Sequence, residues 1–201
     1  GILFDAKGGT HFFRNFYARR TVRIFPLYYA VLAVLFWVVP RFSIFHGPEL
    51  DEVLRRQGWA WAYAVNIHIA REGNWTLPWL GHFWSLAVEE HFYLVWPLVV
   101  WLCPRPVLLK VALGLVAASV ALRMVLYGTG VNHLAPYVLT PCRLDALCIG
   151  AWLAVSLRSD EPREAKVAWL DRVGPWLSVP SAAYIAGIAG EPCRNRVMFG
   201  A

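Results

Sequence analysis

The sequence predicts an all-α protein. We expect a polytopic bundle of about five transmembrane helices, with an additional N-terminal interfacial helix and one short re-entrant or interfacial helix. Of its 201 residues, 58% are hydrophobic and only 16% are charged, whereas soluble domains average about 45–50% and about 25%. The chain also has eleven tryptophans, a residue that gathers at membrane–water interfaces. Apolar runs close to the length of a membrane span recur along it.

Four apolar runs are long enough, or nearly so, to cross a bilayer, and a fifth is shorter. They cover residues 24–40, 83–102, 107–127, 141–157 and 176–189. The run 58–70 is too short to cross easily and carries Asn66 and His68, so we expect it to be the re-entrant or interfacial helix. Because no internal repeat or low-complexity linker divides the chain, we expect a single domain over 1–201.

The positions of lysine and arginine predict how these helices are oriented. Residues 1–23 carry five such cations and one acid, and the positive-inside rule places this end in the cytoplasm. If the run 58–70 does not cross, the basic loops 103–110 and 158–173 also fall inside. The outside loop 128–140 then has no lysine or arginine. If the run does cross, the later loops invert and the asymmetry weakens, so we expect the non-crossing arrangement.

The segment 10–26 precedes the first predicted span and has its own pattern. Its aromatic residues recur at helical spacing and are interleaved with arginines: Phe12, Phe13, Phe16 and Tyr17, with Arg14, Arg19, Arg20 and Arg23. This pattern predicts an amphipathic helix that lies in the cytoplasmic interface. Pro26 has no amide hydrogen, so we expect it to end this helix or to begin the next.

The distribution of charge argues against nucleic acid as a partner, and the spacing of the cysteines argues against a bound metal. The net charge of +6 does not indicate nucleic acid, because the cations lie in short loops between apolar runs rather than along one soluble face. The four cysteines have neither a C-x-x-C spacing nor histidines at zinc-site spacing, so we expect no metal.

The run 83–102 contains two adjacent carboxylates, Glu89 and Glu90, followed by His91. Steps of three and four residues place a polar stripe on one helix face: His82, Ser85, Glu89 and Tyr93. A carboxylate at the bilayer centre costs about 2.5–3.5 kcal/mol, so we expect Glu89 to face the bundle or a wet cavity, about 9 Å below the outer face. Glu90 and His91 point elsewhere and are weaker candidates, which contacts with a neighbouring helix could satisfy. The alternative is that Glu89 only hydrogen-bonds a neighbouring helix.

A second polar insertion lies near residue 140. Thr140 and Pro141 are residues typical of a helix cap and a first helical position. Asp145 then falls near the start of that helix, where the macrodipole favours an anion, and Arg143 is close by. At a depth similar to that of Glu89, a carboxylate–guanidinium–carboxylate cluster is geometrically possible. A salt bridge that joins two helices is the alternative.

Three segments, in this order, resemble the acyltransferase 3 family: FYARRTVRIFPLYY, GHFWSLAVEEHFYLVWP and CRLDALCIGAWLA. These are bacterial multi-helix proteins of the O-antigen and peptidoglycan O-acetyltransferase type, and the likeness is strongest over residues 2–154. The resemblance implies a multi-pass acyltransferase of the bacterial inner membrane. It would move an acyl group, usually acetyl, from cytoplasmic acyl-CoA to a hydroxyl of an envelope carbohydrate or glycolipid, as in lipopolysaccharide modification.

The resemblance also implies roles for individual residues. Arg20 and Arg23 match the R-x-x-R pair of the family and would bind the phosphates of acetyl-CoA, which guanidinium groups recognise in bidentate fashion. Anchoring to lipid head groups is the alternative for this pair. We expect acetyl-CoA to be a donor substrate, with no tightly bound cofactor.

The predicted catalytic residues come from the two later motifs. Glu89 matches the glutamate of the W-S-L motif, and Arg143 and Asp145 match the R-x-D motif. His82, Ser85 and Tyr93 are candidates on the substrate side because they share the face of Glu89.

The catalytic histidine of the family belongs to a helix upstream of these segments, and His11, His68 and His82 do not match its position. We therefore expect a fragment that lacks the first two helices and has little activity by itself. Two other classes stay open. A transporter would use the acids and Arg143 to relay protons or bind a solute, and a non-catalytic membrane scaffold would tolerate Glu89→Gln.

Overall fold

The computed structural model describes residues 3, 6–42, 47–75, 77, 79–158, 168 and 171–172. Within these residues the regular secondary structure is helical throughout, with no strand. The chain divides into two compact units, Gly1–Ser156 and Leu157–Ala201, and nearly all of the described residues belong to the first. The predicted helix at 176–189 lies outside the described residues.

Helix α2 (Phe12–Ala33) begins at the first aromatic residue of the predicted interfacial segment. It continues through a π-helical turn, Val34–Val38, and a 3-10 turn, Val39–Arg41. The prediction of a separate interfacial helix bounded by Pro26 is therefore wrong, because Pro26 lies inside α2. A proline removes one amide donor, and long membrane helices tolerate this loss where neighbouring structure supports both sides.

Three short helices follow: α3 (Pro48–Arg55), α4 (Gly58–Trp61) and α5 (Val65–Glu72). The predicted single helix over 58–70 is wrong, because Tyr63 between α4 and α5 has a left-handed φ of 53°, which a right-handed helix cannot continue through. The buried Tyr63 ring stacks on that of Tyr28 in α2, with ring centroids 3.9 Å apart. At 1.5 Å per residue, α5 covers about 12 Å, too little to span a bilayer.

The long helices of the second half agree well with the sequence. Helix α6 (Phe83–Leu102) has the predicted bounds, and α7 (Arg105–Gly128) extends slightly beyond the predicted run at both ends. Helix α8 (Ala135–Val138), a 3-10 turn over Thr140–Cys142 and helix α9 (Leu144–Ser156) follow.

The predicted start of the helix over 141–157 is wrong by three residues. Pro141 lies in the 3-10 turn, and α9 begins at Leu144. Thr140 does not cap the helix. Its hydroxyl is instead hydrogen-bonded to His91, at 2.8 Å, and to Asn66, at 3.0 Å, so its side chain joins three elements.

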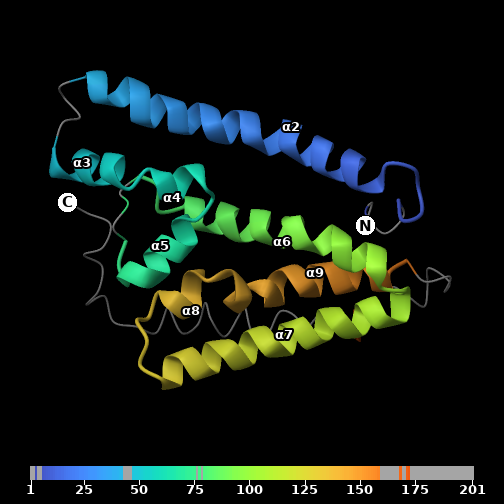
Figure 1. Cartoon of the computed structure of the whole chain (residues 1–201). Helices are drawn as coiled ribbons and strands as arrows, with labels where there is room; N and C mark the ends of the chain where they lie inside the picture. Colours follow the sequence, from blue (N-terminus) through green and yellow to red (C-terminus); the bar gives the residue numbers. More distant parts are fainter. Residues whose placement is uncertain are drawn as a thin grey trace. The chain divides into compact units, whose positions relative to one another are not determined.

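Helix α2 lies along α6 in the antiparallel direction (Figure 1). The contacts begin where Tyr28 meets Phe83, with ring centroids 5.1 Å apart. They end where Phe13 meets Trp101, with ring centroids 5.8 Å apart. Helix α7 packs against α9, and both α5 and α8 pack against α6. The segment expected at the membrane surface therefore packs along a predicted span.

Two clusters of buried apolar residues hold these helices together. One joins α2, α3, α5, α8 and the start of α6, and includes Tyr28, Leu32 and Phe83. The other joins the end of α6 to α7 and α9, and includes Trp96 and Cys148. Each end of α6 thus has its own core, and the polar residues near its middle lie between the two.

Two helical runs of the described part are long and apolar enough to cross a membrane, namely Phe12–Arg41 and Arg105–Gly128. Only 17% of the most apolar window of each is buried, so both present most of their apolar side chains outward. Large exposed apolar surfaces mark contacts with membranes or partners. The expected total of about five spans stays a prediction.

Candidate functional site

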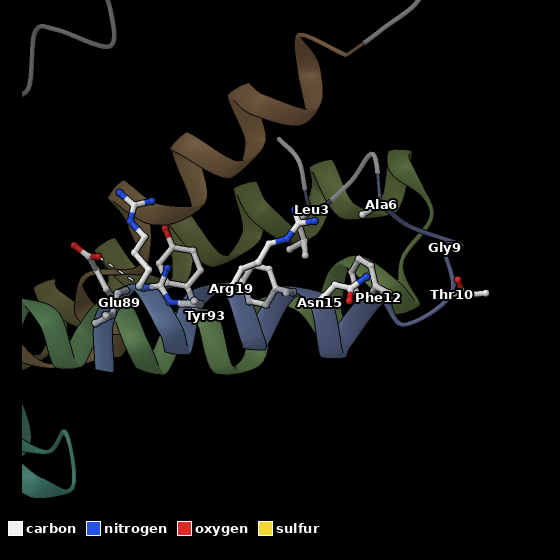
Figure 2. A pocket seen from close by; sticks show the side chains of 13 residues that line it. Leu3, Ala6, Gly9, Thr10, Phe12, Asn15, Arg19, Glu89 and Tyr93 are labelled. Carbon is white, nitrogen blue, oxygen red and sulfur yellow. Dashed lines mark ion pairs between the residues drawn. The ribbon is translucent and has the colours of Figure 1, made fainter. Parts of the chain in front are cut away.

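A cavity of about 670 Å³ lies along α2 and is bordered by α6 and by the segment that precedes α2 (Figure 2). We call it the arginine cavity, because Arg19, Arg20 and Arg23 of α2 line it. Glu89 and Tyr93 of α6 line it as well. Its volume falls within the range of small-molecule sites, about 300–1,000 Å³.

Helical spacing explains why α2 lines the cavity with these side chains. Residues four apart lie one above the other on a helix, so Asn15, Arg19 and Arg23 form one row and Phe16 and Arg20 form a neighbouring row. All five side chains line the cavity. Figure 2 shows Arg19 extending toward Leu3, with Glu89 and Thr10 at opposite ends of the lining.

Arg20 is firmly held on the wall of this cavity. Its Nη2 donates to Glu90 Oε1 at 2.7 Å, and its Nε donates to the same oxygen at 3.1 Å. The guanidinium carbon lies 3.4 Å from the centre of the Tyr93 ring. The two partners are only 17% and 14% exposed, so this ion pair is largely shielded from solvent.

The two adjacent acids differ in their surroundings. Glu89 is 48% exposed, lines the cavity, and has an oxygen 4.0 Å from Arg20 Nη2. As predicted, it faces a cavity rather than only a neighbouring helix. Glu90, judged the weaker candidate from the sequence, makes the closer contact with Arg20.

The expected depths of Arg20 and Glu89 need correction. Arg20 was placed at the cytoplasmic surface and Glu89 near the outer face, but their contact puts both at the same level along α6. This level lies about 9 Å from Phe83, the first residue of α6. The error followed from the division of α2 at Pro26, which removed Arg20 from the helix that runs beside α6.

The remaining residues of the polar stripe line a second cavity of about 430 Å³. His82 and Ser85 contribute to its wall, and Arg23 lines both cavities. His82 is the residue before the first turn of α6, and Ser85 Oγ donates to its backbone oxygen at 3.1 Å. Of the four residues of the stripe, Glu89 and Tyr93 therefore line the arginine cavity, and His82 and Ser85 line the second cavity.

The structure does not bring Arg143 and Asp145 to Glu89. Arg143 Nε donates to the backbone oxygen of Tyr137 at 2.6 Å, and its guanidinium lies over the rings of Tyr137 and Trp84. Asp145 forms an ion pair with Arg123 of α7. For Asp145, the structure shows the alternative that the sequence left open, a salt bridge between two helices.

The structure connects several polar residues to which the sequence assigned no role or, for Glu90 and His91, only a contact with a neighbouring helix. His91, Thr140 and Asn66 form one hydrogen-bonded group across α6, the turn before α9, and α5. Glu90 and Arg123 are the ion-pair partners of two predicted residues. A polar residue inside an apolar run was the available signal, but hydrophobic periodicity does not identify the inner face of a helix that is apolar all round.

Comparison with known proteins agrees with the motifs. Residues 6–190 match the family of the acyltransferase domain, acyltransferase 3, and the chain belongs to this family. The peptidoglycan O-acetyltransferase OatA of Listeria monocytogenes is 31% identical over 154 residues, which cover 70% of this chain and 24% of that protein. The O-acetyltransferase OatA of Staphylococcus aureus is 29% identical over 177 residues, 80% of this chain and 28% of that protein.

The chain therefore spans about a quarter of the length of these curated relatives. No solved structure matches it. The family places the chain among acyltransferases, and its apolar helices agree with a membrane location.

Proposed function

We propose that the chain is the membrane-embedded part of an O-acetyltransferase that moves an acyl group, normally acetyl, from cytoplasmic acyl-CoA to a hydroxyl of an envelope glycan or glycolipid. It would work as a multi-pass protein of the bacterial inner membrane. The observation that carries this proposal is a cavity lined by three arginines and Glu89 in a chain of the acyltransferase 3 family. The relatives support a carbohydrate acceptor, since one is named for peptidoglycan.

Charge and size support an acyl-CoA donor. Coenzyme A carries a diphosphate and a ribose phosphate, and guanidinium groups bind phosphates with paired, charge-assisted hydrogen bonds. The arginine cavity offers three such groups against one exposed carboxylate, Glu89. Its volume is also suited to a ligand of this class.

The proposed reaction exchanges one ester for another. The acceptor oxygen forms a bond to the acyl carbon, the carbon–sulfur bond of the thioester breaks, and coenzyme A leaves as its thiol. The hydroxyl proton must pass to a general base, and donors must stabilise the oxyanion that develops. The resemblance assigns the base to a histidine that no residue of this chain matches. Glu89 is proposed to orient that base or the acceptor.

The catalytic roles of Arg143 and Asp145 stay predictions. In the structure Arg143 lies on the Tyr137 and Trp84 rings, and Asp145 joins α9 to α7 through Arg123. These contacts support a structural role, in which Arg143 and Asp145 position the elements that lie beside α6. The transporter alternative is not favoured, because the chain belongs to an acyltransferase family.

A radiochemical assay tests the proposal. Membranes that contain the chain within the full-length enzyme are incubated with acetyl-CoA labelled in the acetyl group and with peptidoglycan fragments, and label is recovered as a base-labile ester. We expect Glu89→Gln to reduce transfer at least tenfold, because it removes the charge that faces the arginine cavity. Arg14→Gln, an exposed change on the same helix, should leave transfer unchanged. Equal transfer by Glu89→Gln and the unaltered protein would contradict the proposal.

A further inference from the structure

Among the three arginines of the cavity, we infer that Arg19 and Arg23 hold the phosphate groups of the ligand, whereas Arg20 is a positioning residue fixed by Glu90. This inference rests on the proposed acyl-CoA donor and assigns its phosphates to specific side chains. It adds Arg19, which the sequence motifs did not single out, and changes the role of Arg20.

Arg19 and Arg23 are free to receive an anion. Both are exposed and line the arginine cavity, and neither has an ion-pair partner among the described residues. They lie four residues apart on one face of α2, about 6 Å along the helix axis. Two guanidinium groups at this spacing can contact one diphosphate or two separate phosphates.

Arg20 is already committed to other contacts. Two of its nitrogens bind Glu90, and its planar face covers the Tyr93 ring. If Arg20 turned toward a phosphate, the shielded Glu90 carboxylate would lose its ion-pair partner. An unpaired charge that is shielded from water is energetically costly. Arg20 and Glu90 therefore cancel each other, and the charges left facing the cavity are those of Arg19, Arg23 and Glu89.

The cavity walls also separate the two ends of a ligand. Glu89 and Thr10 lie at opposite ends of the lining, with Arg19 between them (Figure 2). A carboxylate repels phosphate, so one phosphate belongs near Arg19 and away from Glu89. Arg23 lines the second cavity as well as the first, so the phosphate that Arg23 holds lies where the two cavities adjoin.

Binding of coenzyme A to the protein in nanodiscs of zwitterionic lipid tests the assignment. We expect Arg19→Gln and Arg23→Gln each to raise the Kd for coenzyme A at least tenfold. Arg20→Gln should raise it less than threefold, and Arg14→Gln, which removes the same charge outside the cavity, should not change it. An unchanged Kd for Arg19→Gln, or the largest increase for Arg20→Gln, would overturn the inference.

The phosphate that each arginine contacts can be identified with 3′-dephospho-coenzyme A. The unaltered protein should prefer coenzyme A over this analogue, and one of the two variants, Arg19→Gln or Arg23→Gln, should lose that preference. Retention of the full preference by both variants would overturn the assignment of separate phosphates to them.

The role of Arg20 is tested in the transfer assay. Arg20→Gln should lower kcat for transfer while the KM for acetyl-CoA stays within threefold, and Arg20→Lys, which can still pair with Glu90, should regain most of the rate. Arg19→Gln should instead raise KM. A raised KM with unchanged kcat for Arg20→Gln would show that Arg20 binds the donor directly.

Two outcomes separate this inference from the proposed function. If the unaltered protein binds coenzyme A and Arg19→Gln binds it equally well, only the assignment of the arginines fails. If the unaltered protein binds no coenzyme A, but phosphatidylglycerol in the nanodiscs raises its thermal midpoint and Arg19→Gln removes that effect, the arginines hold lipid head groups. Both the inference and the acyl-CoA donor then fail.

Discussion

The two neighbouring acids of α6 show how strongly one helical step changes the surroundings of a residue. Glu90 is shielded and bound by Arg20 at 2.7 Å, whereas Glu89 is half-exposed and only approaches the same guanidinium at 4.0 Å. Adjacent residues on a helix point about 100° apart. One acid can therefore serve the packing of α2 against α6 while the other faces the cavity.

Glu90→Gln should lower the free energy of unfolding by about 1.5–3 kcal/mol, the range for a hydrogen bond to a charged group. The physical reason is that Arg20 would remain shielded without an ionised partner. Thermal or denaturant unfolding of the protein in detergent measures the change.

Glu89→Gln is the matched control, because it is the same substitution one residue earlier at an exposed position. We expect it to change the free energy of unfolding by less than about 0.5 kcal/mol. Equal losses for the two variants would contradict the structural role given to the Arg20–Glu90 pair.

At the scale of elements, short helices fix the position of the long ones. Helix α5 packs against α6 and α8, and its Asn66 side chain, only 1% exposed, donates to the Thr140 hydroxyl. The same hydroxyl is bonded to His91 of α6. A buried hydrogen-bonded group of this kind fixes the register of three elements more specifically than apolar contacts can.

His68 makes the stability of α5 depend on pH. It is 2% exposed, and burial, together with the neighbouring Arg56, lowers its pKa below the usual value. The folded protein therefore keeps His68 neutral at a pH where the unfolded chain binds a proton. The part of the free energy of unfolding that depends on neutral His68 should be fully present above about pH 6.5. It should fall as the pH decreases toward the lowered pKa of the folded protein, by at most about 1.4 kcal/mol per pH unit.

Unfolding measured between pH 5 and pH 8 tests this expectation. His68→Gln should remove the contribution of His68 to the slope of the free energy of unfolding against pH. His133→Gln, a change at an exposed histidine, should leave it intact. A slope that is the same in both variants would assign the pH dependence to other groups.

At the scale of the whole molecule, the proposed cytoplasmic donor requires a defined orientation of the long helices in the membrane. The antiparallel contact of α2 with α6 and the helical run Arg105–Gly128 agree with a chain that crosses the bilayer repeatedly. At 1.5 Å per residue, α7 covers about 36 Å, which exceeds the hydrocarbon core. Its two ends should therefore lie on opposite sides of the membrane.

Labelling with a membrane-impermeant maleimide tests this orientation, in a protein whose native cysteines are replaced by alanine. Thr129→Cys, at the exposed end of α7, should be labelled in intact cells. Pro104→Cys, at the exposed turn before α7, should be labelled only after permeabilisation. The reverse pattern would invert the topology, and labelling of both in intact cells would show that α7 does not cross.

The sequence by itself determined the helical class, the bounds of α6, the approximate extent of α7 and the family. Each of these depends on local composition, on the length of apolar runs, or on motifs that are contiguous in the chain. The polar stripe from His82 to Tyr93 was also readable, because a helix places residues three and four apart on one face. Its prediction that Glu89 faces a cavity agrees with the structure.

Only the tertiary structure decided which polar residues meet. Glu90 rather than Glu89 pairs with Arg20, Asp145 pairs with Arg123, and Arg143 lies apart from both acids of α6. The continuity of α2 through Pro26 was also visible only in the structure. Such pairings depend on how helices far apart in sequence approach one another, and in a helix that is apolar on most faces the hydrophobic pattern does not determine which face turns inward.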